Sequence, residues 1–210
     1  MRHSFFIALE GIDGAGKDTI AAMVSRHTFD GGKSFFVTEE PSAGQTGVLI
    51  RDILDGKVAA PKTNKGLQSL FVEDRLDHIR STVLPLLQSG KWVLSVRYWL
   101  STLAYGMLEG EVDRYTALHR EVIGGEMIYP DVTIVLDITA EEGLRRIRQA
   151  GRAFDWYAKL EMLPRIRKNY LTLAQRNDIG RIVVIDAMQP TDTVAAHTIA
   201  VITNITRERA

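Results

Sequence analysis

A glycine-rich loop that joins an apolar run to an amphipathic stretch constrains the fold of this chain more than any other feature. Residues 5–9 are aromatic, β-branched or aliphatic, which is typical of a short buried strand. Residues 11–17 read Gly-Ile-Asp-Gly-Ala-Gly-Lys, and apolar side chains then recur at helical spacing from Ile20. The sequence therefore predicts a strand, a tight glycine-rich turn and a helix in direct succession.

The spacing of this loop is that of a Walker A phosphate loop. Its backbone N–H groups can surround a phosphate, the helix N-terminus adds positive potential, and Lys17 can bridge to the γ-phosphate of a nucleotide. The alternative is a strand-to-helix turn without a ligand, and the lysine in register argues against it. The residues expected to contact ATP are Gly11, Ile12, Asp13, Gly14, Ala15, Gly16, Lys17, Asp18 and Thr19.

The residue after the lysine departs from that motif. The motif has a serine or threonine whose hydroxyl ligates magnesium, and this chain has Asp18. Because aspartate also favours helix N-termini, Asp18 is either a helix cap or a ligand of an Mg²⁺ ion that lies between it and the phosphates. Asp137 closes an apolar run in the manner of a Walker B aspartate, and we rank it below Asp18 as a metal ligand.

The rest of the chain repeats the alternation of strand and helix. Apolar runs occur at residues 34–38, 92–96, 133–136 and 181–185, and a long helical pattern over residues 67–83 continues until Gly90. This alternation predicts an α/β fold with a parallel sheet, in which ligands bind at the carboxyl ends of the strands. No Pro/Gly-rich linker divides the chain, so we expect one domain over residues 1–210.

Charge and cysteine content exclude several other classes. Lys plus Arg is 26 and Asp plus Glu is 26, so no chain-wide field favours nucleic acid or an anionic membrane as a partner. The chain has no cysteine, which excludes disulfides and a thiolate nucleophile. The apolar runs are too short for a signal peptide or for a membrane span of about 20 residues. We therefore expect a soluble, cytoplasmic protein.

With the loop, four further blocks resemble the thymidylate kinases, a family of P-loop nucleoside monophosphate kinases. Residues 6–17 are similar to the opening signature of that family, and residues 38–41 with 47–51 are similar to its T-R-E-P turn and the segment that follows. Residues 70–78 resemble its L-F-A-A-D-R-x-x-H helix, residues 97–105 its R-Y-x-x-S-x-x-A-Y segment, and residues 130–137 its P-D-x-T-x-x-L-D strand. The resemblance implies a P-loop NTPase three-layer sandwich with a helical lid.

The resemblance also implies an acceptor site. An aromatic residue of the middle helix stacks on the acceptor base in such kinases, and arginines hold its phosphate. Phe71 and Arg75 are four residues apart and share one helical face, so they can do both. A helical apolar position is also the ordinary place for a core residue, which is the alternative for Phe71. The implied acceptor residues are Asp13, Glu40, Arg51, Phe71, Arg75, Arg97, Ser101 and Tyr105.

By the same resemblance, Asp13 accepts a hydrogen bond from the sugar 3′-hydroxyl, Tyr105 packs beneath the sugar, and Arg51 and Arg97 complete the phosphate clamp. The basic stretch of residues 145–168 contains the implied lid, at about residues 145–160. A lid arginine can stabilise the charge that develops during phosphoryl transfer, although a solvated basic face is the alternative. The implied catalytic residues are Lys17, Asp13, Arg97, Arg148 and Arg152.

Four positions depart from the family. The arginine of T-R-E-P is Glu39 here, and the arginine of the lid's D-R-x-E sequence is Trp156. The aspartate of its D-R-Y sequence is Val96 here, and we hypothesise that Asp18 replaces this carboxylate as the protein ligand of the metal. The residue after the Ala-Tyr pair, often a glutamine that reads thymine, is Gly106, which we expect to enlarge the base pocket.

The resemblance implies an enzyme that transfers the γ-phosphoryl group of ATP, with Mg²⁺, to dTMP, and a homodimer without nucleic-acid or membrane partners. Two alternatives remain at this stage. One is a kinase for another, for instance modified, pyrimidine nucleoside monophosphate. The other is a catalytically silent nucleotide-binding homologue.

Overall fold

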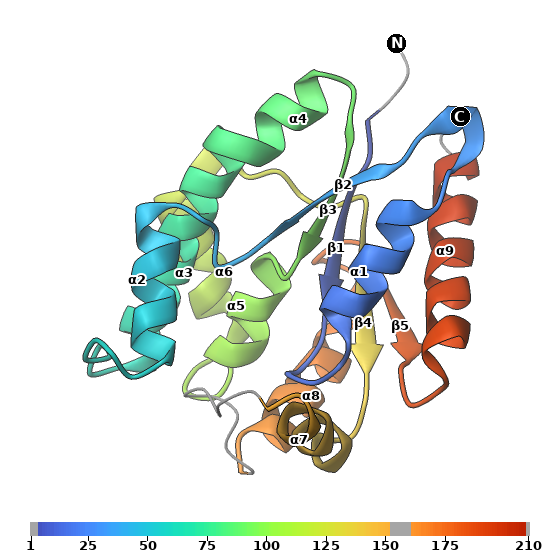
Figure 1. Cartoon of the computed structure of the whole chain (residues 1–210). Coiled ribbons are helices and arrows are strands. Elements are labelled where there is room, and N and C mark those ends of the chain that lie inside the picture. The colour runs from blue at the N-terminus through green and yellow to red at the C-terminus, as the bar shows by residue number, and fades with distance from the viewer. Residues whose placement is uncertain (1–3, 152–160, 209–210) are drawn as a thin grey trace.

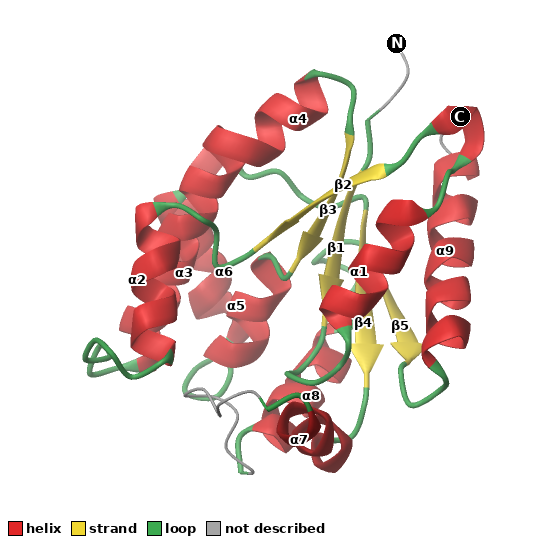
Figure 2. Cartoon of the chain, in the orientation of Figure 1, coloured by secondary structure: helices red, strands yellow, loops and turns green. Residues whose placement is uncertain are grey.

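A five-stranded parallel sheet forms the centre of the molecule (Figure 1). The computed structural model describes residues 4–151 and 161–208. The strands of this part are β1 (Phe6–Glu10), β2 (Phe35–Glu39), β3 (Trp92–Val96), β4 (Val132–Asp137) and β5 (Ile182–Asp186). Their order is β2-β3-β1-β4-β5, which places β1 and the loop that follows it in the middle. Helices flank the sheet (Figure 2), and the expected α/β fold is confirmed.

The helices form two connected groups. One pairs α1 (Lys17–Arg26) with α9 (Thr191–Glu208). The other contains α3 (Asn64–His78), which packs against α2 (Gln45–Leu54), α5 (Trp99–Gly106) and α6 (Val112–Val122). In this group α5 also packs against α8 (Leu163–Leu173), which contacts α7 (Ala140–Gln149). None of the helices in the described ranges is long and apolar enough to cross a membrane.

Four strands continue to an acidic residue that follows the apolar run. The apolar runs predict strands that end at positions 9, 38, 136 and 185, whereas these strands end at Glu10, Glu39, Asp137 and Asp186. The difference arises because the backbone ladder continues after apolar burial stops, since ladder pairing needs only N–H and C=O groups. A row of carboxylates therefore lies at the carboxyl edge of the sheet.

The long helical pattern before Gly90 is one continuous run in three parts. α3 passes into a π-helical segment (Ile79–Val83) and then into α4 (Leu84–Gln88). The run begins at the N-cap Thr63, whose side chain accepts from the N–H of Gly66, and it ends before Gly90, which has a φ of 77°. The expected end is confirmed, and the helix begins three residues earlier than the apolar pattern, which starts at position 67.

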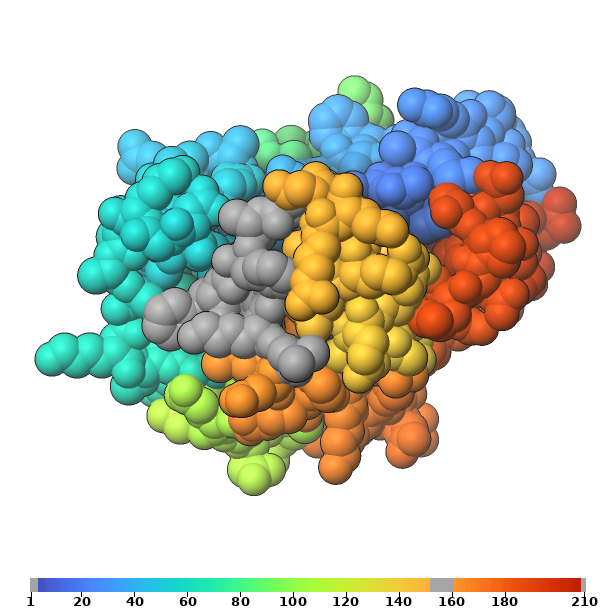
Figure 3. All heavy atoms as spheres, turned by 60° about the horizontal axis from the view of Figure 1, so that its bottom comes forward, coloured from blue at the N-terminus to red at the C-terminus, as the bar shows by residue number. Residues whose placement is uncertain are grey.

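The carboxyl ends of the strands lie on one edge of the sheet, the lower edge in Figure 1. Figure 3 turns this edge toward the viewer and shows α7, in amber, between α9 in red and α8 in orange. The loops after the strands meet here. This is the edge at which the sequence predicts ligand binding.

Candidate active site

The loop after β1 adopts the conformation that its glycines allow. Gly11, Gly14 and Gly16 have φ values of 137°, 82° and 88°, which are strained for residues with a side chain. At Gly14 a Cβ atom would lie 2.4 Å from the backbone oxygen of Gly143, so the loop and α7 touch through two glycines. The close contact between the two backbones therefore fixes the loop, and position 14 has no room for a side chain.

Lys17 is buried at the start of α1. Its Nζ atom donates to the backbone oxygens of Gly11 at 3.0 Å and Ile12 at 2.9 Å. Burial and the nearby guanidinium of Arg97 lower the pKa of Lys17 to about 8. The ammonium group is thus held by two neutral carbonyls, and an anion placed in the loop would be a stronger partner.

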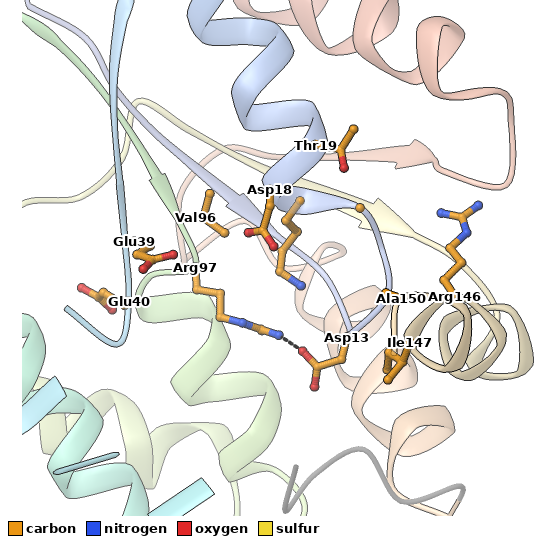
Figure 4. Close-up of a pocket in the computed structure, with 13 residues that line it drawn as sticks. Asp13, Asp18, Thr19, Glu39, Glu40, Val96, Arg97, Arg146, Ile147 and Ala150 are labelled. Atoms are coloured by element: carbon orange, nitrogen blue, oxygen red, sulfur yellow. Dashed lines mark hydrogen bonds and ion pairs between the residues drawn. The ribbon is translucent and has the colours of Figure 1, made fainter. Parts of the chain in front are cut away.

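A cavity of about 390 Å³ lies in front of this loop, and we call it the loop cavity (Figure 4). It contains cationic groups, which can bind phosphate, and carboxylates, which can bind a metal ion. Its lining residues are Asp13, Gly14, Gly16, Lys17, Asp18, Thr19, Glu39, Glu40, Val96, Arg97, Arg146, Ile147 and Ala150.

A second cavity, of about 170 Å³, continues from the loop toward α9, and we call it the α9 cavity. Thr19 and Arg146 line both cavities, so the two adjoin. The Arg146 guanidinium donates to Glu142 at 2.6 Å and to the backbone oxygen of Ala187 at 3.0 Å. The remaining residues of the α9 cavity are Ala15, Gly16, Ile20, Ala187, Gln189, Thr191 and Val194.

A third cavity, also of about 170 Å³, lies between α3 and α5, and we call it the α3–α5 cavity. Asp13 and Arg97 line it as well as the loop cavity, so this pair stands where the two cavities meet. Phe71 contributes to its apolar wall. The other lining residues are Pro41, Leu54, Gln68, Ser101, Thr102 and Tyr105.

Arg97 follows β3 in a left-handed backbone conformation, with a φ of 66°. Its guanidinium forms an ion pair with Asp13, lies 5.4 Å from the centre of the Tyr105 ring and donates to Ser101 Oγ at 3.3 Å. Burial alone would raise the pKa of Asp13, but the charges of Arg97 and Lys17 together with the hydrogen bonds of Arg97 and Tyr105 outweigh it, and the pKa lies below its usual value. The pair is therefore charged on both sides.

The backbone around Arg97 is held by Glu10, the last residue of β1. Its carboxylate accepts from the N–H groups of Tyr98 at 2.8 Å and Ser101 at 3.1 Å, and from the hydroxyls of Ser101 at 2.6 Å and Tyr170 at 2.9 Å. The residue is fully buried, and burial raises its pKa. Glu10 thus joins β1 to the first turn of α5 and to α8.

Arg75 lies behind the wall of the α3–α5 cavity rather than in it. The side chain is 1% exposed and donates to Glu40 at 2.6 Å, to Thr102 Oγ1 at 3.1 Å and to His119 Nε2 at 2.6 Å. Burial and the charge of Arg75 lower the pKa of His119 to about 3, so this histidine is neutral. Arg75 and Glu40 form a buried ion pair beneath the cavity.

Arg51, on α2, lies beside the turn that follows β2. Its guanidinium donates to the backbone oxygens of Ser42, at 2.7 Å, and of Pro41. The side chain is 39% exposed and faces Glu39 at 3.5 Å. The turn therefore holds one side of the Arg51 guanidinium, and part of the side chain is exposed to solvent.

Asp18 lies in the first turn of α1 and is exposed. It lines the loop cavity together with Glu39 and Val96, as Figure 4 shows. The rival carboxylate, Asp137, is bound by Arg167 of α8 through two hydrogen bonds of 2.7 and 2.8 Å. Over the described residues no group of three or more histidine, aspartate or glutamate side chains is arranged to hold a metal ion.

The basic segment is only partly described. Arg148 lies exposed on α7, and Arg152 falls outside the described residues. The helical spacing of the segment favours a stripe of Arg145, Arg148 and Arg152, whereas it is Arg146 that lines two cavities. Arg146 faces the glycine-rich loop because of how α7 packs in the folded protein. Spacing along the helix does not reveal this contact.

The structure contradicts one expectation about the base pocket. Gly106 does not enlarge it, because the glycine is buried against the ring of Tyr115 and a Cβ atom there would lie 2.6 Å from that ring. Gly106 is also absent from the lining of the α3–α5 cavity. The small residue makes room for an aromatic ring of α6, not for a larger ligand.

Comparison with known proteins identifies the family. The family model described as thymidylate kinase matches residues 9–198. A probable thymidylate kinase of Pyrococcus horikoshii is 35% identical and covers 85% of this chain and 87% of its own length. The thymidylate kinases of Thermomicrobium roseum and Chlamydia abortus are 36% and 34% identical, over 96% and 88% of this chain and 96% and 89% of their own lengths. The chain therefore belongs to the thymidylate kinase family.

Proposed function

We propose that this enzyme transfers the γ-phosphoryl group of ATP to dTMP and releases dTDP. One observation carries the proposal most directly. Asp13 and Arg97 line both the loop cavity, which has the features of a donor site, and the α3–α5 cavity, which has the apolar wall of a nucleoside site. A donor phosphate in one cavity and an acceptor phosphate in the other would meet at this pair.

Positioning and charge do most of the work in such a reaction, because the transferred group needs little covalent help from the protein. Lys17 and the loop N–H groups hold the β- and γ-phosphates. Arg97 holds the acceptor phosphate, and Arg51, which has its outer edge in solvent, approaches it from α2. Asp13 keeps Arg97 in place and accepts from the sugar hydroxyl. The lid arginines Arg148 and Arg152 remain proposed partners of the transition state.

Each nucleoside has a cavity of its own. The donor base lies in the α9 cavity, where the planar Arg146 guanidinium is fixed by Glu142 and by a backbone carbonyl. The acceptor base lies in the α3–α5 cavity against Phe71, with Tyr105 beneath the sugar. Arg75 acts on this cavity through Thr102, one of the three side chains to which it donates.

The residues at the loop cavity fit a magnesium ion. Mg²⁺ is usually held by one or two carboxylates together with substrate phosphates and water, rather than by an all-protein cage. Asp18 and Glu39 supply such carboxylates on either side of Val96. We propose that Asp18 is the metal ligand, since it lines the loop cavity and Asp137 does not. Bound Mg²⁺ would neutralise charge on the transferred phosphoryl group.

The family suggests a homodimer, a cytoplasmic location and one catalytic domain over residues 1–210 with a lid at about 145–160, and we extend these to this chain as proposals. Val48 and Leu49 of α2 are 49% and 39% exposed, and an apolar surface of this kind is compatible with a second copy. Sedimentation equilibrium tests the dimer, and a monomer over the working concentration range would contradict it.

Turnover on a panel of dTMP, dUMP, dCMP, dGMP, dAMP and thymidine, with ATP and Mg²⁺, tests the proposed function. We expect dTDP from dTMP as the preferred reaction. Preferred turnover of a different monophosphate would change the substrate but leave the site intact. ATP binding without turnover of any acceptor would favour a silent nucleotide-binding protein instead.

A further inference from the structure

The turn between β2 and α2, residues 40–44, is held from behind by α3, which packs beside α2 (Figure 1). Two successive side chains of α3 bind it. Arg75 donates to Glu40 at 2.6 Å, and Asp74 accepts from Ser42. The proposed chemistry gives Asp74 no role, although its side chain is ionisable and only 1% exposed. A carboxyl group buried to this degree needs hydrogen-bond partners, and those partners show which part of the molecule it holds in place.

Both oxygens of Asp74 bind one residue of this turn. The N–H group of Ser42 donates to Oδ2 at 2.7 Å, and the Ser42 hydroxyl donates to Oδ1 at 2.6 Å. The same hydroxyl oxygen accepts at 3.0 Å from the N–H group of Gly44, the residue that caps α2. Two hydrogen bonds to one residue fix its orientation as well as its position. Asp74 therefore sets the direction in which the backbone of Ser42 points.

The backbone oxygen of Ser42 in turn holds Arg51. Arg51 Nη1 donates to this oxygen at 2.7 Å, and Nη2 donates to the backbone oxygen of Pro41. The oxygen can approach α2 this closely because Gly47, one helical turn before Arg51, has no side chain, and a Cβ atom there would lie 2.0 Å from it. The Arg51 guanidinium thus binds two carbonyls of a turn whose orientation Asp74 fixes.

We propose that Asp74 is a positioning residue for the acceptor phosphate, because it holds the Arg51 guanidinium in place through Ser42. This inference rests on the proposed function, in which Arg51 approaches that phosphate. Asp74 itself lines none of the loop, α9 and α3–α5 cavities, so it acts without touching a nucleotide. An arginine that is held before the ligand arrives loses less conformational freedom on binding. The effect concerns the phosphate of the acceptor and not its nucleoside.

Calorimetric binding of dTMP and of thymidine tests the assignment, because the two ligands differ only in the phosphate. We expect Asp74→Ala to weaken dTMP binding about tenfold and to leave thymidine binding unchanged. In turnover, kcat/KM for dTMP should fall by a similar factor, mainly through KM. A general loosening of the fold would instead weaken the binding of both ligands. Asp77→Ala, at an exposed position of the same helix, is the matched control and should change neither.

Three further variants separate positioning from a structural role. Asp74→Asn should keep most of the dTMP affinity, because the amide oxygen can accept from the Ser42 N–H group while the amide nitrogen donates to the Ser42 hydroxyl oxygen. Arg51→Ala should also weaken dTMP relative to thymidine, and adding Asp74→Ala to it should cause no further loss. Ser42→Ala removes only the hydroxyl and should weaken dTMP binding about threefold. Unchanged ATP affinity shows that a variant is folded.

The outcomes separate this inference from the proposed function. If the wild-type enzyme phosphorylates dTMP but an ATP-binding Asp74→Ala variant keeps the dTMP-to-thymidine affinity ratio, Asp74 does not position the phosphate clamp. Additive losses in the double variant, or an unchanged ratio in Arg51→Ala, would also overturn the assignment. If Asp74→Ala no longer binds ATP, the ratio in Ser42→Ala decides in the same way. If the wild-type enzyme does not phosphorylate dTMP, the proposed function fails, and this assignment fails with it.

Discussion

At the scale of single residues, the chemistry of the site depends most on Lys17. In the free protein its ammonium group is buried, is bound to two backbone oxygens and has a pKa of about 8. The unfolded chain holds this proton up to its ordinary pKa of 10.5, so the unfolded state binds more protons between these values and stability increases with pH across this window. A bound triphosphate has the opposite effect, because its charge favours the ammonium form.

Nucleotide binding should therefore take up a proton above about pH 8. We expect ATP affinity to fall, and proton uptake per ATP to increase toward one, between about pH 7.5 and about pH 9. Calorimetry in two buffers with different ionisation enthalpies measures the uptake. Lys17→Met should show no comparable pH-dependent uptake. Equal uptake at both pH values in the wild-type protein would contradict the assigned pKa.

Asp18 is the second residue whose role can be isolated. Asp18→Ala should lower Mg²⁺-dependent activity by about 100-fold and remove the Mg²⁺ dependence of ATP binding, because the carboxylate at this part of the loop cavity is lost. The double variant Asp18→Ser with Val96→Asp should keep activity, since it moves the carboxylate to the end of β3. Turnover and calorimetric titration of Mg²⁺ with ATP measure both effects. An Asp18→Ala enzyme as active as the wild type would refute the metal assignment.

The conformation of the glycine-rich loop could be predicted from the sequence, because the spacing of its glycines indicates where the backbone turns. Gly106 and Arg75 could not, because their roles depend on which side chains other helices bring. The ring of Tyr115 fills the space above Gly106, and the carboxylate of Glu40 holds Arg75 behind the cavity wall. Neither neighbour can be found from periodicity or from a signature.

At the scale of elements, the contact between α5 and α6 has little tolerance. Gly106→Ala should lower the free energy of unfolding by about 1–3 kcal/mol, because its Cβ atom would lie 2.6 Å from the buried ring of Tyr115. Denaturant unfolding measures the loss. Gly125→Ala is the control, since a Cβ atom there has no neighbour within 4 Å. Equal stability of the two variants would show that α6 moves aside at no cost.

Glu10 couples three elements to the site. Glu10→Gln would turn an amide nitrogen toward hydroxyl and N–H donors, so we expect the free energy of unfolding to fall by about 1–3 kcal/mol and KM for dTMP to increase as Arg97 loses its fixed backbone. Chemical unfolding and steady-state kinetics measure the two effects. Glu73→Gln, at an exposed site on α3, should change neither. A Glu10→Gln enzyme with wild-type stability and normal KM would show that Glu10 does not hold the backbone around Arg97.

The order and type of the elements can be predicted from the sequence, because the spacing of apolar residues shows which side of each strand or helix is buried. The ends of the strands were harder to predict from the sequence. Glu10 and Asp137 look like loop residues, yet they complete the strands and find their partners, Tyr170 and Arg167, on α8. An acidic residue directly after an apolar run is the signal that such a partner exists, although the sequence does not say on which helix.

At the scale of the whole molecule, the parallel order of the strands brings together segments that are far apart in the chain. β1 lies between β3 and β4, so the loop after β1, Arg97 after β3 and α7 after β4 meet at one edge. Asp13 and Arg97 are 84 residues apart and form the ion pair at which two cavities join. The proposed transfer takes place at this junction, where a donor phosphate and an acceptor phosphate would become neighbours.

Direct transfer across this junction is the central claim, and a label test measures it. The wild-type enzyme is mixed with ATP labelled in its terminal phosphate, dTMP and Mg²⁺, and the labelled products are separated. The account predicts that the label appears in dTDP, in equal amount with the ADP formed, and that Arg97→Ala slows this transfer while ATP still binds. Label released as inorganic phosphate, or label that stays in ATP while both nucleotides bind, would contradict it.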